Sequence, residues 1–326
     1  MRAAVVTRYG SPDVIQIRDV EKPSPKDNEV LIKVRAASVN PLDLTGMSGT
    51  PYFARLMGGL RKPKDTRLGT DVAGQVEAVG KNVARFKPGD EVFGLCRGSF
   101  AEYACTSETA SFMSALAVKP ARVTFEQAAA APVAGLTALQ GLRDKGNIQA
   151  GSKVLINGAA GGVGTFAVQV AKSYGADVTG VCSTRNVDML RSLGADRVID
   201  YTQEDFSKSG QRYDVLFDCI GNHSLRACRR VLNPGGKYVL IGAEHGRWIS
   251  PVDSLIKALV VSCFVKDVVP LMAKGNNEDL AMLGEIIETG KVTPAIEKCY
   301  RLGEISEALR HLEGGHARGK IVIIVD

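Results

Sequence analysis

The chain has 326 residues, which is beyond the length at which a single hydrophobic core usually stops growing, so two domains are expected. Its composition, 45% hydrophobic and 23% charged, is ordinary for a soluble globular protein. The net charge of +6 is mild, and the basic residues are not interleaved with aromatic ones, so no nucleic-acid partner is expected.

The cysteines and the apolar stretches indicate in which cellular compartment the protein is located. The seven cysteines are odd in number and form no Cys-x-x-Cys, which indicates reduced thiols in an intracellular, cytoplasmic protein. The N-terminal apolar run is too short for a signal peptide. The longest apolar stretch, 255–265, contains Lys257 and is too short to span a bilayer, so we expect no membrane span. The densest basic stretch, 55–67, is either a solvated loop or a site for an anionic ligand or surface.

The first part of the chain is predicted to form short strands and turns. Strands are expected at 30–40, 71–80 and 90–94, and Pro- and Gly-containing turns separate them. No long helical pattern occurs before about residue 124. The Ala-rich segment 124–142 is then predicted to be helical, with Thr124 as a cap and Pro132 as an interruption.

After Ala150 the pattern alternates between strand and helix. Such alternation predicts a parallel sheet with helices on both faces. The expected strands are 153–157, 177–182, 197–201, 213–221 and 237–242, the expected helices are 163–174, 186–194 and 224–232, and the end of the chain adds helices at 278–289 and 304–313 and a strand at 320–326.

A glycine-rich loop, INGAAGGVG (156–164), follows the first of these strands and opens the next helix. Its spacing, Ala159-x-Gly161-x-x-Gly164, places backbone N–H groups and a helix N-terminus where the pyrophosphate of a dinucleotide can bind. The alternative is a glycine-rich turn that packs the helix tightly on the sheet. A nucleotide-triphosphate loop is excluded because the Gly-Lys-Ser/Thr ending is missing.

The residues after the second strand favour NADP(H) over NAD(H). An NAD site places an acid about 20 residues past the loop, where it binds the ribose 2′-hydroxyl. This chain has Ser183, Thr184 and Arg185 there, and a hydroxyl with a guanidinium suits a 2′-phosphate. The alternative for Arg185 is an exposed residue at a helix start.

Several segments in order along the chain resemble the zinc-independent branch of the medium-chain dehydrogenase/reductase superfamily, the quinone oxidoreductases and zeta-crystallin-like enzymes. The resemblance implies an α/β fold: a GroES-like β-barrel catalytic domain that begins with 1–123, a Rossmann domain with a doubly wound parallel sheet that binds NADP at 124–265, and a return to the catalytic domain at 266–326. The segments are AASVNPLD (36–43), LGTDVAGQVEAVG (68–80), PGDEVFG (88–94), GSFAEYA (98–104), PVAGLTALQGL (132–142), INGAAGGVGTFAVQVAK (156–172), SLGADRVIDY (192–201) and GHARGKIVI (315–323).

The same resemblance provides a test for metal. Zinc members take catalytic ligands at the positions that here are Asn40, Thr70 and, with a less certain alignment, Ala134, and none of these is a soft or imidazole ligand. A structural zinc lobe needs four closely spaced cysteines, whereas only Cys96 and Cys105 occur in that region. We therefore expect no metal.

Without zinc the chain lacks a Lewis acid to ionise an alcohol. Hydride transfer from NADPH to a quinone or an α,β-unsaturated carbonyl needs only a hydrogen-bond donor at the developing oxyanion. The sequence therefore predicts a reductase of such small molecules. The alternative is an NADPH-binding sensor or interaction protein with little catalysis.

The resemblance also implies cofactor contacts. Asn40 is expected near the nicotinamide ribose and Thr137 near the pyrophosphate, although Thr137 could instead bond its own helix backbone. Tyr201 could instead be an aromatic residue packing at a strand end, and 316–318 a simple turn. The remaining expected contacts are Ala160, Gly161, Gly162, Val163 and Gly164 at the pyrophosphate, Ser183, Arg185 and Tyr201 at the 2′-phosphate, Gly242 at the cofactor edge, and His316, Ala317 and Arg318 from the catalytic domain.

Further expectations concern the residues near the substrate and the residues of the dimer interface. The family often has a Tyr where this chain has Leu44; Tyr52 in the adjacent loop could replace it as proton donor or could simply pack there, and no general acid is assigned. The β-branched run 258–265 is predicted to form an edge strand that pairs with its copy in a homodimer. Coverage of this strand by the chain's own C-terminal helices is the alternative.

Overall fold

The computed structural model describes residues 1–52, 54–241 and 267–325, and these divide into two compact units. The first unit comprises Met1–Leu136, Lys274–Gly290 and the segment from Ile296 onward. The second comprises Thr137–Ala273 and Lys291–Ala295. The domain boundaries expected after residues 123 and 265 stay a prediction.

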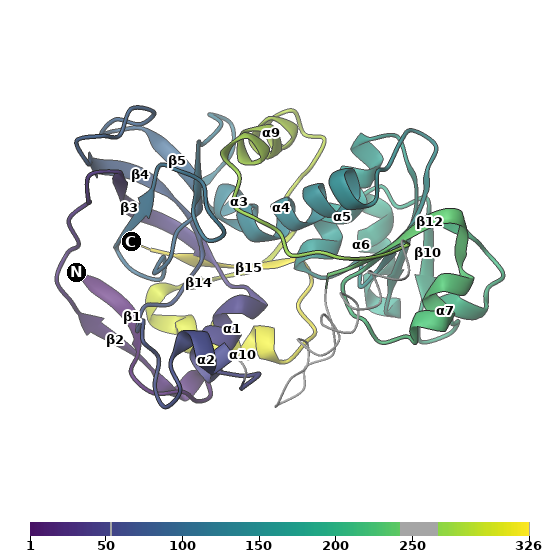
Figure 1. Ribbon diagram of the computed structural model, residues 1–326, viewed down its shortest axis with the longest axis horizontal. Coiled ribbons are helices and arrows are strands. Elements are labelled where there is room, and N and C mark those ends of the chain that lie inside the picture. The colour runs from purple at the N-terminus through teal and green to yellow at the C-terminus, as the bar shows by residue number, and fades with distance from the viewer. Residues whose placement is uncertain (53, 242–266, 326) are drawn as a thin grey trace. The chain divides into compact units, whose positions relative to one another are not determined.

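The first unit is built around one long strand, β3 (Glu29–Ser38). β4 (Asp71–Val79) pairs with one edge of β3 along its whole length. Along the other edge, β6 (Tyr103–Ser107) pairs with the first half and β15 (Lys320–Ile324) with the second half. A strand from the very end of the chain is therefore part of the sheet formed by its beginning (Figure 1).

The remaining strands and helices of the first unit extend or cover this sheet. The sheet order is β14-β15-β3-β4-β5-β7, and β1 and β2 form a separate antiparallel pair. The further bounds are β1 Arg2–Val6, β2 Ile15–Asp19, α1 Pro41–Ser48, α2 Ala54–Gly58, β5 Glu91–Leu95, β7 Ala115–Val118, α3 Phe125–Ala130, α4 Pro132–Gln140 (which runs into the second unit), α9 Asn277–Glu288, β14 Ile296–Arg301 and α10 Ile305–Glu313.

Alternation of apolar and polar residues explains where the core of the first unit lies. In β3 the side chains of Val30, Ile32 and Val34 are buried, whereas Lys33 and Arg35, on either side of Val34, are exposed. The buried face joins Phe100, Met47 and the apolar residues of β15 and α10 in one cluster. The three strands predicted in this region are observed as β3, β4 and β5.

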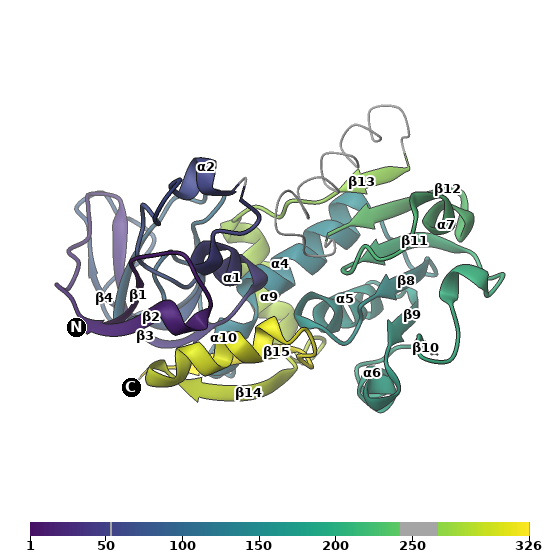
Figure 2. The ribbon, with the colours of Figure 1, turned by 90° about the horizontal axis from the view of Figure 1, so that it is seen from below.

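The second unit has a six-stranded parallel sheet in the order β10-β9-β8-β11-β12-β13. The chain starts at the centre with β8, moves outward to β10, and then crosses to the other side of β8, which is the strand order of dinucleotide-binding doubly wound folds. Figure 2 shows the strands from β12 to β10 side by side in this order. The bounds are β8 Lys153–Asn157, α5 Gly162–Ser173, β9 Asp177–Cys182, α6 Val187–Ser192, β10 Arg197–Asp200, β11 Tyr213–Asp218, α7 Leu225–Arg230, β12 Leu232–Leu240 and β13 Val268–Pro270, with a π-helical turn at Gly141–Lys145.

The predicted α/β class and parallel sheet are thus confirmed, and β8 and β9 have the bounds expected from the sequence. Two expectations concern residues outside those described: the edge strand at 258–265 and the turn at Gly242. Among the described residues, none of the helices combines the length and the apolar character needed to cross a bilayer.

Candidate active site

The glycine-rich loop joins β8 to α5 in the second unit, as predicted. Gly158 has φ of +79°, a left-handed conformation that other residues rarely adopt, and Gly161 is the N-cap of α5. A Cβ on Gly164 would lie 2.2 Å from the carbonyl oxygen of Gly158, so only glycine lets the helix approach the strand this closely. Gly161 has no side chain to cap the N–H groups of the first helical turn. These groups fit a pyrophosphate, because a helix N-terminus attracts anions.

The residues predicted to surround a 2′-phosphate follow the two neighbouring strands. Ser183 and Arg185 come directly after β9, and Tyr201 comes directly after β10. The Tyr201 N–H donates to the Cys182 carbonyl at 2.9 Å, which joins the ends of the two strands. Arg185 is exposed, and the side chain of Tyr201 is 59% exposed. The structure therefore brings these three residues to the same edge of the sheet as the glycine-rich loop.

Asp200 is a residue of this edge that sequence reasoning did not identify. Its carboxylate accepts hydrogen bonds from the Thr184 hydroxyl at 2.6 Å and from the Thr202 N–H at 3.0 Å. The Thr184 bond is the main reason why the pKa of Asp200 lies below its ordinary value. Asp200 stands at the end of β10, and its position beside Ser183 and Thr184 follows from the pairing of β10 with β9.

The first unit holds a buried polar cluster around Asn40, which lies between β3 and α1. The Asn40 amide donates to the Asp71 carboxylate at 2.9 Å and to the Ser38 carbonyl at 3.3 Å. Its oxygen accepts from the Lys320 ammonium at 2.6 Å. Asn40 is 2% exposed, so its carboxamide is held in one orientation by partners from three strands.

Lys320 is the cation of this cluster. Its ammonium lies 3.3 Å from the Asp71 carboxylate, and both side chains are almost completely buried. It also donates to the Val39 carbonyl, so all three of its N–H groups have acceptors. Sequence reasoning missed this residue, although a lysine at the start of the apolar strand KIVII was a usable signal.

Asp43 is a second buried carboxyl of the cluster, and its pKa is raised to about 7. Burial is the main cause; hydrogen bonds from the Asn40 N–H at 2.7 Å and the Thr70 hydroxyl at 3.2 Å act in the opposite direction. Asp43 therefore changes its protonation near neutral pH inside the unit. Perturbed carboxyls of this kind are found at functional sites more often than elsewhere.

Two of the three positions tested for zinc, Asn40 and Thr70, lie within the same cluster, and the third, Ala134, is a buried residue of α4. Asn40 and Thr70 both use their side chains in the hydrogen bonds above, and neither is a typical zinc ligand. In the part of the chain that the structure describes, no three His, Cys, Asp or Glu side chains form a group that could hold a metal ion.

Tyr52 and Leu44 have different environments in the first unit. Leu44 packs against the hydrophobic core, so it has no polar role there. The Tyr52 ring lies 4.6 Å from the guanidinium of Arg55, whose other neighbour is the Tyr9 ring at 4.5 Å. Tyr52 is 37% exposed, and both of its expected roles, as a proton donor or as a residue that packs in the loop, stay predictions.

The remaining predicted contacts fall into different units. Thr137 is buried in the part of α4 that belongs to the second unit. His316, Ala317 and Arg318 precede β15 in the first unit, where the Arg318 N–H donates to Glu297. Their roles at a cofactor stay predictions.

Comparisons with known proteins agree with both units. The family described as "Alcohol dehydrogenase GroES-like domain" matches residues 26–130, and the family described as "Zinc-binding dehydrogenase" matches residues 193–323. The 2-methylene-furan-3-one reductase of Solanum lycopersicum is 36% identical over 99% of this chain and 79% of its own length.

Two solved structures are similar over nearly the whole chain. The quinone oxidoreductase from Coxiella burnetii has a TM-score of 0.86 and 32% identity, covering 100% of this chain and 99% of that one. A mycobacterial protein solved in complex with NADPH has a TM-score of 0.81 and 27% identity, covering 99% of this chain and 100% of that one. The chain belongs to the medium-chain dehydrogenase/reductase superfamily, in its quinone oxidoreductase branch.

Proposed function

We propose that this protein reduces a quinone or an α,β-unsaturated carbonyl with NADPH and without a catalytic zinc. The observation that carries the proposal is the edge of the parallel sheet in the second unit. There a glycine-capped helix N-terminus, Ser183, Arg185 and Tyr201 follow three neighbouring strands. The Solanum lycopersicum relative and the two similar structures support the same reaction and cofactor.

The residues of the chain would bind and orient the cofactor. The first turn of α5, from Gly161 to Gly164, would hold the pyrophosphate with Ala160, and Thr137 would lie close to it. Ser183 and Arg185 would hold the 2′-phosphate through charge-assisted hydrogen bonds. NADPH supplies the hydride when it is bound. Asn40, Gly242 and the segment 316–318 are proposed as further contacts.

The polar groups of the buried cluster in the first unit support the proposal that no catalytic zinc is bound there. The Asn40 oxygen already accepts from the Lys320 ammonium, and a divalent cation placed there would meet that positive charge. Reduction at a conjugated carbon also needs no Lewis acid to ionise an alcohol.

The experiment is NADPH consumption by the purified protein with a quinone, an enone, the matching saturated ketone and no acceptor. We expect turnover with the quinone or the enone, little with the saturated ketone, and the same rates after exhaustive chelation. Tight NADPH binding without turnover on any conjugated acceptor would instead favour the NADPH-binding sensor. Loss of activity together with one stoichiometric zinc per chain would overturn zinc independence.

Cofactor preference gives a residue-level prediction. We expect NADPH to bind more tightly than NADH by about 2–3 kcal/mol, the size of a few charge-assisted hydrogen bonds. Arg185→Ala should remove much of this difference, measured as the ratio of the two dissociation constants. Arg191→Ala is the matched control, because Arg191 is an exposed arginine of α6 beside Asp188. Equal affinities for the two cofactors in the unmodified protein would contradict the assignment.

We further propose a homodimer formed through 258–265 and a cytoplasmic location. The β-branched run supports the first, and the odd number of cysteines without a Cys-x-x-Cys supports the second. The assembly is tested by a mass measurement described below. The location is tested by imaging a tagged full-length chain, and enrichment in an organelle would contradict it.

A further inference from the structure

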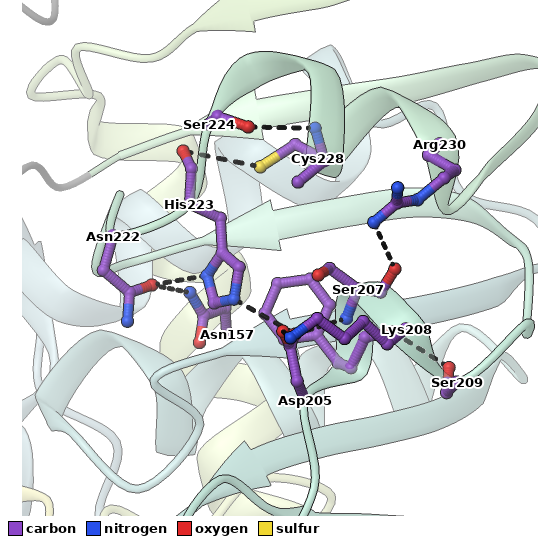
Figure 3. Close-up of polar contacts among 12 residues, drawn as sticks. Asn157, Asp205, Ser207, Lys208, Ser209, Asn222, His223, Ser224, Cys228 and Arg230 are labelled. Atoms are coloured by element: carbon purple, nitrogen blue, oxygen red, sulfur yellow. Dashed lines mark hydrogen bonds and ion pairs between the residues drawn. The ribbon is translucent and has the colours of Figure 1, made fainter.

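A chain of hydrogen bonds in the second unit has no role in the reaction described above. It starts at the buried Asp218, whose carboxylate accepts from the Asn157 amide. From Asn157 it runs through Asn222 to His223 and ends at Asp205 (Figure 3). Asp218 ends β11, and Asn157 ends the adjacent strand β8, directly before Gly158 of the glycine-rich loop. The His223 ring also packs against Phe206, with the ring centroids 4.4 Å apart and the ring planes tilted by 47°.

The donors along this chain are determined from its buried end. The Asp218 Oδ1 atom accepts from the backbone N–H groups of Ile220 and Gly221, so the Asn157 group that faces it at 2.8 Å must be the amide nitrogen. The second N–H of that amide points to Asn222 Oδ1 at 3.1 Å, which fixes the orientation of Asn222.

The orientation of Asn222 then determines the protonation of His223. His223 Nδ1 lies 2.9 Å from Asn222 Oδ1, so this ring nitrogen must donate. His223 Nε2 lies 3.3 Å from Asp205 Oδ1. Burial raises the pKa of Asp205, but hydrogen bonds from Ser207 and the nearby Lys208 outweigh this and lower it to about 2, so Asp205 is a carboxylate and accepts. Both ring nitrogens donate, and the arrangement therefore requires the imidazolium form.

The other charged and titratable groups around His223 do not take its place as the donor to both Asn222 and Asp205. Lys208 lies 3.2 Å from the Asp205 carboxylate but is mostly exposed. On α7, the Cys228 thiol faces the His223 carbonyl, and burial raises its pKa to about 12, so it is uncharged. The Arg230 guanidinium donates to the Ser207 carbonyl. On β12, the Tyr238 hydroxyl donates to Asp218.

The turn that carries Asn222 packs directly on the cofactor loop. A Cβ on Gly158 would lie 2.8 Å from the Ile220 side chain and 3.3 Å from that of Cys219. The Cys219 N–H also donates to the Asn157 carbonyl at 3.0 Å. The position of the turn 219–222 and the position of the glycine-rich loop are therefore mechanically linked.

We propose that protonated His223 is a positioning residue for the cofactor, which holds the turn 219–222 against the glycine-rich loop. This inference rests on the proposed NADPH site. A neutral imidazole has only one N–H; if Asp205 keeps it, the Nδ1 lone pair faces the Asn222 oxygen. Rotation of the Asn222 amide would relieve that contact but would bring two NH₂ groups together at Asn157. If Nδ1 keeps the proton instead, the Asn222 bond remains but the Nε2 lone pair faces the Asp205 carboxylate. Either neutral form loses one of the two bonds, so loss of the proton loosens the turn, and NADPH binds more weakly as the pH rises.

The test is the NADPH dissociation constant of the full chain, measured by fluorescence between about pH 6 and about pH 8.5, the range in which histidines commonly change charge. In the unmodified protein we expect affinity to fall about fivefold more across this range than in His223→Gln, the factor of one net hydrogen bond. Comparison with the variant cancels the titration of NADPH itself. His311→Gln is the matched control, because His311 also faces a carboxylate, Glu297 at 3.2 Å, but in the first unit.

Asp205→Asn and a spectroscopic measurement make the test independent of folding defects in His223→Gln. Removal of the carboxylate should shift the fall in affinity to lower pH, because it removes the negative partner of the imidazolium. Nitrogen NMR of the labelled ring should show two protonated nitrogens at about pH 6. Parallel pH profiles for the unmodified protein and His223→Gln, or a singly protonated ring at that pH, would overturn the proposal. Absence of NADPH binding at every pH would instead reject the proposed function.

Discussion

Asp43 and Asp71 are two carboxyls of one buried cluster, but only one of them has a cation as a direct partner. Lys320 contacts Asp71, whereas within the described part of the chain Asp43 accepts hydrogen bonds only from a backbone N–H and a hydroxyl. Burial of Asp43 is the main reason why its pKa is raised to about 7, and the neighbouring Asp71 carboxylate raises it further.

A raised carboxyl pKa makes the folded protein less stable as the pH rises. The folded state keeps the Asp43 proton up to about pH 7, whereas the unfolded state loses it near the ordinary value of about 4. Between these values the folded state binds more protons, so the free energy of unfolding falls with pH. We expect the unmodified protein to lose about 3 kcal/mol relative to Asp43→Asn between about pH 5 and about pH 8.

Asp43→Asn is a suitable partner for this measurement, because its oxygen can accept from the Asn40 N–H while its nitrogen faces the Thr70 hydroxyl. Chemical unfolding at several pH values gives both curves. Curves that run parallel over the whole range would show that Asp43 is ionised in the folded protein at low pH.

At the scale of the elements, the junction of β8 and α5 contains two glycines with different surroundings. Gly164 is closely packed, whereas Gly161 has room for a side chain. Gly164→Ala places a methyl group 2.2 Å from the Gly158 carbonyl oxygen and should destabilise the protein by about 2–4 kcal/mol. Gly161→Ala meets the same oxygen at 3.5 Å, an ordinary contact, and should leave the melting temperature nearly unchanged. Thermal unfolding of the two variants tests this difference. If the loop tolerated no side chain at either position, both variants would be destabilised equally.

The elements that the sequence predicted well are those with a strong local pattern. β8 and β9 are apolar runs with clear boundaries, and α5 has apolar residues at helical spacing. Helix α1 was missed because it buries only Asp43 and Met47, and its start depends on Pro41 and on the Asp43 bond to Asn40 rather than on an apolar stripe. A local pattern of apolar residues identifies a helix or strand only when one side of that element faces the core.

The same limit applies to the site. The glycine-rich loop, Ser183 and Arg185 follow from spacing within a short segment, and the structure places them on one sheet edge. The contact of Lys320 with Asp71 joins residues 249 positions apart, and no local pattern reports such a pair. The approach of Asp200 to Thr184 likewise depends on strand pairing.

At the scale of the whole molecule, the proposed homodimer is tested by mass. The run 258–265 lies outside the described residues, so the prediction depends on its β-branched composition. We expect light scattering at low micromolar concentration to give the mass of two chains, and Val261→Lys to reduce it to one. Val118→Lys, a change of the same type at a valine that is 59% exposed in the first unit, should remain dimeric. A monomer mass for the unmodified chain would remove the case for this interface.

The pairing of β3 with β15 has a consequence for how the protein is made. Domains form as the chain leaves the ribosome, with N-terminal segments first. Here the first sheet stays incomplete for longer, because the second half of one edge of β3 and the cationic partner of Asp71 are supplied by the strand that begins at Lys320. The parallel sheet of the second unit lies within Thr137–Ala273 and is synthesised before this strand. The first unit is therefore completed after the parallel sheet of the second unit has been synthesised, and a chain that is cut before residue 320 cannot complete its first sheet.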